Sequence, residues 1–311
     1  MTSRLLLIAT ALGLATALLL LAPLRLGLIG VMLGPFALLP LFVSALGFGT
    51  LAGAVSGLVA ALIIGILFGP MSGLASFLLT LVPAVWAGHM AGLMRTDHGV
   101  EEWYPVHALL FRMTLLSAAL TIAFGWISGF NAENLVGQME AAYGEMLKSM
   151  PPDQRPPAGD IAQMATQVVN LLPYVAPASL LLMYGVNLML GARIARSQGW
   201  MMRPKDDLPR DLSLPAISVA IFAAGLVATF AGGNIGLLGQ VIVGAFGTAF
   251  VFVGFAVLHL VLRNSAARGV VLGLLYAATL LILLPAFFMC VIGMAETLLH
   301  WRVRYLSQSN E

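Results

Sequence analysis

The stretch GTLAGAVSGLVAALIIGILFG, residues 49–69, decides the fold of this chain. It is almost wholly apolar, and at about 1.5 Å per residue a helix of this length spans roughly the 30 Å hydrocarbon core of a bilayer. In lipid, small residues at every fourth position let neighbouring helices approach to backbone contact. We therefore expect a central transmembrane helix that meets different helices at its two ends. The seam of small residues consists of Gly49, Gly53, Gly57, Ala61, Gly65 and Gly69.

Such a seam has two interpretations. It forms either ordinary small-residue packing or the pivot of a transporter core that moves. The spacing alone does not separate them, because both need the same close approach of helix backbones.

The composition places the chain in a membrane. Of its 311 residues, 60% are hydrophobic and only 9% are charged, whereas a soluble domain carries about 25% charged residues. The net charge of +2, without a basic cluster interleaved with aromatics, gives no sign of nucleic-acid binding. The single cysteine, Cys290, excludes an intramolecular disulfide and a cysteine-based zinc site. We expect an all-α, polytopic transmembrane bundle of about eight or nine helices.

Apolar windows define the expected spans and divide the chain into three parts. The first run lacks a small-x-small cleavage site, which favours an uncleaved helix over a signal peptide. The parts are a core at 1–192 with an insertion at 130–172, a basic loop at 193–213, and C-terminal helices with a tail at 214–311. The nine expected spans lie near residues 5–22, 28–46, 49–69, 71–93, 107–128, 173–192, 214–232, 236–262 and 268–293.

The loop at 193–213 carries five basic residues and is therefore cytoplasmic by the positive-inside rule. Counting spans back places the N-terminus in the cytoplasm and the 130–172 segment outside, in a multi-pass protein of the inner (plasma) membrane of bacterial type. Counting forward places the tail, with Arg302 and Arg304, outside, which disagrees with the rule. Either one late span is not a true crossing, or this tail tolerates the outer side.

The 130–172 segment is the largest part outside the expected spans. Its apolar residues recur at helical spacing on both sides of a proline-rich sequence, PPDQRPP at 151–157. This pattern predicts two short amphipathic helices around a hinge. The two helices rest either on the membrane and the bundle, or over a cavity as a lid.

We expect no enzymatic activity. An active site needs a nucleophile, a base or a metal cluster within reach of one another, and the five histidines are scattered along the chain. Ser56 and Ser72 lack the leading glycine of the usual intramembrane serine-hydrolase motif. No phosphate-binding loop of the Walker type is present, so the chain has no ATPase of its own. We expect neither a metal nor a cofactor.

Polar residues at membrane depth cost free energy and are candidates for function. Asn187 lies mid-span beside Tyr184, and its amide bonds either a neighbouring helix or a ligand. Trp126 and Trp86 lie near span ends, where they form an aromatic belt or a stacking wall for a flat ligand. Arg25 lies between the first two spans and either reaches the lipid headgroups or belongs to the site. These five residues are the ligand-binding candidates.

Two stretches suggest a family: GPFALLPLFVSALGFGTLAGAVSGLVAAL at 34–62 and GPMSGLASFLLTLVPAVWAGHMAGL at 69–93. Together with the small-residue face of Ala11 and Ala15, they resemble the membrane-embedded substrate-binding (S) components of energy-coupling factor vitamin transporters. This likeness covers about residues 5–192. Over its whole length, the chain resembles the YybS-like family of uncharacterised bacterial membrane proteins, which is similar to those components.

The resemblance implies a six-helix core with a cavity that opens outside and is capped by outer loops, which favours the lid. It also implies that the small-residue face of the first helix docks on a separate transmembrane partner driven by ATPases. The chain departs from that fold by its long 130–172 segment and its extra helices at 214–293. Our leading hypothesis is a protein of the lipid bilayer that binds or helps translocate a small molecule. The alternative is a membrane scaffold or assembly factor for other proteins.

Overall fold

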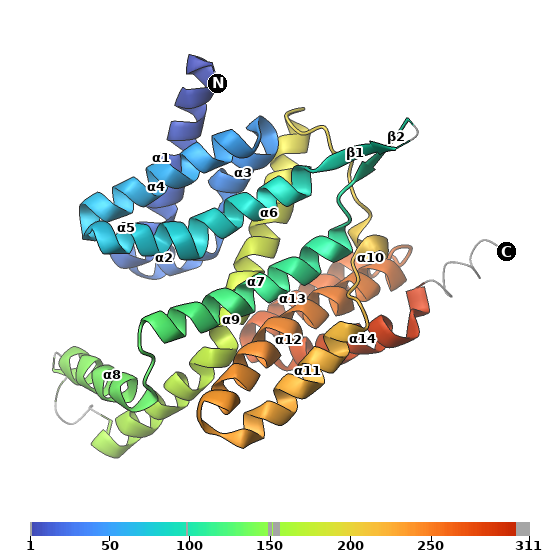
Figure 1. The fold of residues 1–311 in the computed structure, drawn as a ribbon. Coiled ribbons are helices and arrows are strands. Elements are labelled where there is room, and N and C mark those ends of the chain that lie inside the picture. Colours follow the sequence, from blue (N-terminus) through green and yellow to red (C-terminus); the bar gives the residue numbers. More distant parts are fainter. Residues whose placement is uncertain (1, 98, 149–150, 152–155, 303–311) are drawn as a thin grey trace.

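The chain folds as an all-α bundle of membrane-crossing helices (Figure 1). The computed structural model describes residues 2–97, 99–148, 151 and 156–302. Among these residues, seven helices or helix groups are long and apolar enough to cross a membrane, or eight if a bent helix pair is counted as one span. The expected bundle is confirmed, but two of the nine expected spans take another form. The seven are Ser3–Arg25, Gly27–Phe48, Thr50–Phe68, Pro70–Gly92, Val106–Ile127, Gly159–Ser197 and Gly233–Val261.

The elements follow one another with short connections. The second and fourth spans are each interrupted, and a small β-hairpin follows the fourth. In the first half the elements are α1 Ser3–Arg25, α2 Gly27–Leu33, η1 Gly34–Phe36, α3 Leu39–Phe48, α4 Thr50–Phe68, α5 Pro70–Ser76, the π-helical turn η2 Phe77–Leu81, α6 Val82–Gly92, β1 Met94–Asp97 and β2 Val100–Trp103. In the second half they are α7 Val106–Ile127, α8 Ala132–Leu147, α9 Ala158–Ser197, α10 Leu208–Asp211, α11 Ile217–Ala228, η4 Thr229–Ala231, α12 Gly233–Val261, α13 Arg268–Ile282 and α14 Leu284–Leu299.

Helix α4 is the centre of the first group of spans, where it packs against α1, α3, α5 and α6. A Cβ atom at Gly53 would lie 2.6 Å from the Cβ of Ala45 in α3, and one at Gly13 in α1 would lie 2.5 Å from the Ser56 carbonyl oxygen. The Ser56 hydroxyl is also 2.8 Å from the carbonyl oxygen of Ala9. Side chains at these positions would push the helices apart, so the missing side chains set the spacing between them.

The two ends of the seam have another role. Gly49 and Gly69 have φ of +93° and +95°, and no atom lies within 4 Å of where their Cβ would be. They end one helix and begin the next, which is a backbone conformation that glycine adopts without strain. The expectation that these two residues pack helices together is wrong, because they form the turns on either side of α4. Gly65, by contrast, lies opposite Gly73 of α5.

A second central helix, α12, organises the C-terminal half. In its most apolar window 61% of the residues are buried, against 39% for α4. A Cβ at Gly239 would lie 2.5 Å from the Gly225 carbonyl oxygen of α11, and one at Gly254 would overlap the Met289 carbonyl of α14. The stretch at 49–69 is therefore the centre of the first four spans only, and the expectation of one central helix for the whole chain is wrong.

Helix α9 joins the two groups and is continuous over 40 residues. It runs through Pro173 and Pro177, so the expected separate amphipathic helix before residue 173 is the first part of the spanning helix. At about 1.5 Å per residue α9 is roughly 60 Å long, about twice the hydrocarbon core. Its first part projects from the bundle together with α8, which packs along it (Figure 1). Of the expected proline hinge, residues 152–155 lie outside the described residues.

Residues 200–212, which we call the strap, cross one face of the molecule after α9. Arg203 is buried and donates to the Ala91 carbonyl oxygen at the end of α6, at 2.8 Å. Its other nitrogens bind the Asp206 carboxylate, the closest at 2.6 Å. The strap is thereby fixed to the end of the fourth span, where a guanidinium also complements the helix dipole.

Two further arginines hold the strap to the C-terminal half. Arg263, just after α12, forms an ion pair with Asp207, and this hydrogen bond holds the pKa of the Asp207 carboxyl below its usual value. Arg302, just after α14, is buried and donates to the carbonyl oxygens of Pro209 and Leu212 at 2.8 and 2.7 Å. The ends of α6, α9, α12 and α14 therefore lie on one side of the molecule, which we call the strap side.

The last expected span, 268–293, is a bent helix pair. The chain bends by 114° between α13 and α14, and Leu283 between them has φ of +56°. The seventh expected span, 214–232, is a shorter helix, Ile217–Ala231. The connection between the fourth and fifth expected spans contains the hairpin β1–β2, in which Met94 pairs with Trp103.

We predict that Glu296→Ala lowers the free energy of unfolding by about 3 kcal/mol, because removal of one partner leaves the other charge buried and unpaired. Glu296 accepts from the Arg302 guanidinium at 2.9 Å, and both side chains are 5% exposed. The matched control is Glu102→Ala, whose partner Arg95 is 72% exposed and whose loss costs less than about 1 kcal/mol. Denaturant titration of the purified protein in mixed micelles measures both. Equal losses would contradict the assignment of Glu296 as a buried anchor.

Candidate functional site

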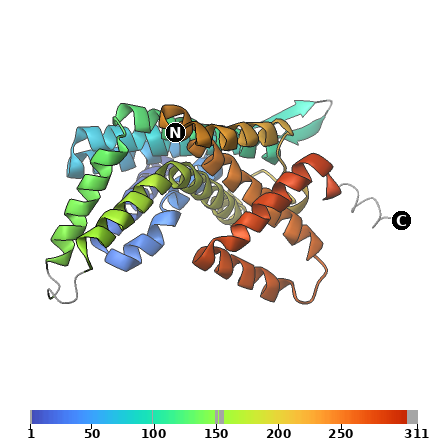
Figure 2. The same ribbon diagram turned by 90° about the horizontal axis from the view of Figure 1, so that it is seen from below.

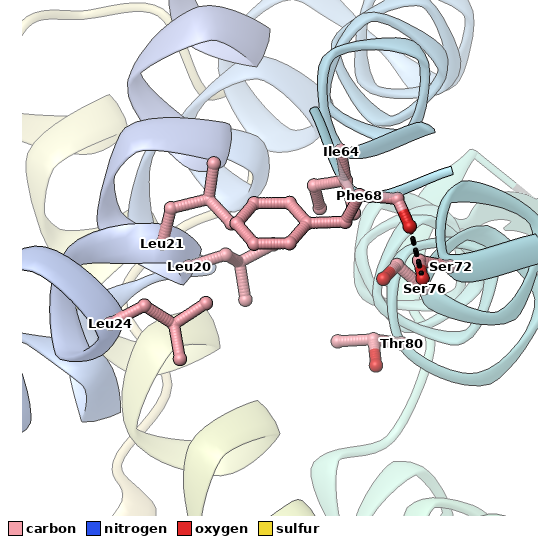
Figure 3. A pocket seen from close by; sticks show the side chains of 8 residues that line it. All are labelled: Leu20, Leu21, Leu24, Ile64, Phe68, Ser72, Ser76 and Thr80. Carbon is pink, nitrogen blue, oxygen red and sulfur yellow. Dashed lines mark hydrogen bonds between the residues drawn. The ribbon is translucent and has the colours of Figure 1, made fainter. Parts of the chain in front are cut away.

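A cavity of about 290 Å³ lies between α1, α4 and the fourth span (Figure 3). We call it the hydroxyl crevice. One of its walls carries three hydroxyl groups and the other carries aliphatic and aromatic side chains. The eight lining residues are Leu20, Leu21, Leu24, Ile64, Phe68, Ser72, Ser76 and Thr80.

The hydroxyl crevice lies on the side of the membrane opposite the strap. The fourth span runs from Pro70 to Gly92, and its Gly92 end is fixed to the strap through Arg203 and the Ala91 carbonyl. The start of α5, which carries Ser72, is therefore at the other face. Leu24 and Phe68 stand at the ends of α1 and α4 that meet there.

The hydroxyl wall follows from the spacing of three residues. Ser72, Ser76 and Thr80 are four residues apart, so they share one face of the fourth span (Figure 3). Ser72 donates to the Phe68 carbonyl oxygen at 3.0 Å.

The other two hydroxyls of this wall have no hydrogen-bond partner within the described part of the chain. Hydroxyls elsewhere in the apolar helices usually bond their own backbone, as Thr121 does when it donates to the Ser117 carbonyl oxygen at 2.8 Å. Ser76 and Thr80 are half-buried, and their hydroxyls remain available to a ligand.

The apolar wall comes from two different helices. Leu20, Leu21 and Leu24 stand on α1, and Ile64 and Phe68 face them from α4. None of the eight lining residues is ionisable. A charged group that entered would lose its hydration without gaining a counterion, which is costly in an apolar environment.

Thr80 belongs to the π-helical turn η2, in which the Val82 N–H donates to the Phe77 carbonyl oxygen. Pro83 follows this turn and has no N–H to offer the Leu79 carbonyl four residues back. That carbonyl accepts a hydrogen bond from the Tyr184 hydroxyl of α9 at 3.1 Å instead. π-Helical turns frequently occur at functional sites, and here Tyr184 holds the turn that presents Thr80 to the hydroxyl crevice.

Asn187 lies one turn further along α9 and binds the break in the second span. Its side-chain nitrogen donates to the carbonyl oxygens of Pro35 and Met183, each at 2.6 Å. Pro35 lies in η1, where α2 and α3 are separated. Asn187 and Tyr184 are both fully buried, and their hydrogen bonds connect helices. The buried Asn187 carbonyl oxygen has no partner among the described residues.

The other three expected ligand residues are spread over the molecule. Trp126 is 87% exposed at the end of α7, Arg25 is exposed at the end of α1, and Trp86 is half-buried against the core. None of the five candidates lines the hydroxyl crevice. Their role in ligand binding stays a prediction, and the structure does not bring them together.

The α8 segment does not cover a cavity at Asn187. None of its residues is buried, and it packs along the projecting part of α9. The first helix presents different alanines to the bundle and to the surface. Ala11 is exposed and Ala15 is half-buried, whereas Ala9 and Ala17 are the alanines fully buried in the bundle.

A second cavity, of about 300 Å³, lies on the strap side between the start of α7 and the strap. Arg203 in its wall is neutralised by Asp206, so Asp211 gives this cavity a negative charge. Within the described residues, no three His, Cys, Asp or Glu side chains are grouped to hold a metal ion. The lining residues are Trp103, Pro105, Val106, His107, Arg203, Asp206 and Asp211.

Comparison with known proteins identifies a family of membrane proteins. The model of a family described as "Predicted membrane protein (DUF2232)" matches residues 14–297. No curated protein matches the chain. No solved structure matches it either.

We predict that Tyr184→Phe lowers the free energy of unfolding by about 1 kcal/mol, since it removes the hydroxyl that satisfies the Leu79 carbonyl and keeps the ring. The matched control is Tyr143→Phe on α8, whose hydroxyl forms no hydrogen bond in the described structure. Denaturant titration in mixed micelles compares the two variants with the parent. Indistinguishable stabilities would show that Tyr184 does not hold the π-helical turn.

Proposed function

Because this chain belongs to the DUF2232 family of predicted membrane proteins, whose model covers residues 14–297, we propose that it works within the bilayer as a binding protein for a small amphipathic molecule. It binds this molecule without an ATPase of its own and is not an enzyme. The observation that carries the proposal is the hydroxyl crevice, because its two walls suit the two parts of such a molecule.

The lining of the crevice limits the chemistry of the ligand. The aliphatic wall favours a hydrocarbon chain, whose burial gains about 25 cal/mol per Å² of apolar surface. The hydroxyls of Ser76 and Thr80 can donate to and accept from a polar head. Since no ionisable residue lines the cavity, the head is uncharged. The ligand class is therefore a neutral amphiphile with a hydrogen-bonding head group.

The family resemblance supports the same proposal. S components bind their substrate inside the membrane and depend on a separate transporter partner for energy, and the chain has no Walker-type loop. By this analogy the protein lies in the plasma membrane with its N-terminus in the cytoplasm, and the hydroxyl crevice faces outward. The exposed Ala11 edge of α1 is then the surface that meets a transmembrane partner.

We predict that a monoacylglycerol raises the thermal unfolding temperature of the detergent-purified protein in a saturable way. The double variant Ser76→Ala/Thr80→Val removes both free hydroxyls and should weaken the apparent affinity roughly tenfold, which is about 1.4 kcal/mol for two hydrogen bonds. The matched control Thr121→Val removes a hydroxyl that bonds its own helix and should leave the affinity unchanged. A fatty acid of the same chain length, ionised at neutral pH, should bind more weakly than the monoacylglycerol.

Two outcomes would contradict this function. The first is that the double variant and the parent show the same affinity, so that the amphiphile binds elsewhere. The second is that no monoacylglycerol stabilises the protein at any chain length tested. Native mass spectrometry of the protein extracted from membranes gives an independent reading, because a resident neutral amphiphile should be lost from the double variant and kept in Thr121→Val.

One observation favours the alternative of a membrane scaffold or assembly factor. The projecting part of α9 exposes Met164, Val168 and Leu171, at 54%, 38% and 55%, and large exposed apolar residues beyond the bundle suit a protein partner. A stoichiometric protein partner that is lost on Met164→Glu/Leu171→Glu, combined with no amphiphile binding, would favour the scaffold.

A further inference from the structure

We propose that α13 and α14 form a re-entrant loop. The pair enters the membrane from the strap side, turns at Leu283 within the hydrocarbon core, and returns to the strap side. The partner of its apolar tip is the acyl-chain region of the bilayer. The end of α14 then lies on the same side of the membrane as the strap.

The entry point is fixed by an ion pair. Arg263 directly follows α12 and binds Asp207 of the strap. Helix α13 begins at Arg268, only a few residues later. The connection between α12 and α13 therefore lies on the strap side.

The exit point is fixed by a buried arginine. Arg302 follows α14 and donates to the Pro209 and Leu212 carbonyl oxygens of the strap. It also binds Glu296, and both side chains are 5% exposed. A chain that had crossed the membrane between residues 268 and 302 would place Arg302 a full bilayer away from these partners.

The lengths of the two helices match a turn inside the membrane. Helix α13 has 15 residues and α14 has 16, so each is about 23 Å long, shorter than the hydrocarbon core of about 30 Å. Helix α14 packs on α12 where Gly293 meets the Phe250 carbonyl. Its first turn therefore lies beside the middle of α12. Figure 2 shows the two helices as a V with its apex away from the C-terminal end.

The tip of the loop has the surface of a lipid-facing segment. Leu280, Leu281 and Ile282 are 83%, 84% and 68% exposed, and Phe287 is 63% exposed. A run of this kind is expelled from water and is stable among acyl chains.

At Leu283, the residue of the break, both backbone polar groups are paired, as the bilayer interior requires. The Leu283 N–H donates to the Thr279 carbonyl oxygen at 3.3 Å, and the Leu283 carbonyl accepts from the Ala286 N–H at 3.0 Å. The single left-handed residue therefore leaves neither of its polar groups unpaired. Pro285 lies in the first turn of α14, where it has no hydrogen bond to lose.

The re-entrant loop removes the conflict in the charge pattern. With α13–α14 as a crossing, the tail with Arg302 falls on the side opposite the basic strap. With a re-entrant loop it falls on the strap side, together with Arg203 and Arg263, as the positive-inside rule requires.

The test is single-cysteine labelling of the full chain in membranes. Replacement of the only cysteine, Cys290→Ala, gives the background. Single cysteines are placed at Ser265 in the α12–α13 connection, Leu281 at the tip and Ser309 in the tail. Lys205→Cys marks the strap side and Glu133→Cys marks the opposite side. A membrane-impermeant maleimide is applied to right-side-out and to inverted vesicles.

We expect Ser265→Cys and Ser309→Cys to be labelled only in the vesicles in which Lys205→Cys is labelled. Leu281→Cys should remain unlabelled in both, and should react at least tenfold more after solubilisation in denaturing detergent. Leu280→Cys serves as a second tip variant if Leu281→Cys fails to accumulate.

Two results would overturn the proposal. Labelling of Ser309→Cys together with Glu133→Cys would show that the pair crosses the membrane. Labelling of both tip cysteines from the strap side at the rate of Lys205→Cys would show that the pair lies on the aqueous surface. Both results are independent of which membrane face is cytoplasmic.

Discussion

Backbone-to-backbone contact at glycine is the constraint on which the rest of this structure depends. Between membrane helices apolar burial gives little drive for association, so van der Waals contact at short range has to hold them together. Gly254 and Gly293 place the backbones of α12 and α14 against each other, and Gly53 does the same for α4 against α3. Helix α9 joins the two groups, because Gly191 lies against Phe42 of α3 and the α12 residue Gly244 lies against the Tyr174 backbone of α9.

The same close packing lets the protein keep interrupted helices inside the membrane. Breaks in the second and fourth spans disturb backbone pairing, which is costly in a bilayer. Two fully buried side chains of α9 satisfy carbonyl groups at these breaks, because Asn187 donates to the Pro35 carbonyl and Tyr184 donates to the Leu79 carbonyl. The break in the fourth span becomes a π-helical turn that carries Thr80. The position of Thr80 in the wall of the hydroxyl crevice therefore depends on the irregular turn of the fourth span and on the hydrogen bond from Tyr184 that stabilises it.

Spacing and hydropathy predicted the bundle and the packing positions in the middle of α4, because both depend on local pattern. They could not show that Gly49 and Gly69 form turns, because the spacing of residues in the sequence does not reveal a positive φ. The rule that polar residues at membrane depth are functional selected Asn187 and Tyr184, whose hydrogen bonds in the structure join helices. The fourfold spacing of Ser72, Ser76 and Thr80 was visible in the sequence, but the facing wall comes from α1 and α4. The disagreement over the tail came from counting 268–293 as a crossing, and the sequence could not show that Arg302 contacts the carbonyl oxygens of Pro209 and Leu212.

The most direct test of backbone contact at glycine is a glycine-to-alanine series with the free energy of unfolding as the readout. Gly73, Gly88, Gly239, Gly254 and Gly293 have atoms of a neighbouring helix within 3.0 Å of an added Cβ, whereas Gly137, Gly144 and Gly273 have no atom within 4 Å. We expect losses of about 1–3 kcal/mol at the five contact positions and no loss, or a gain of up to about 1 kcal/mol, at the three open ones. Losses that bear no relation to the space at each glycine would contradict this expectation.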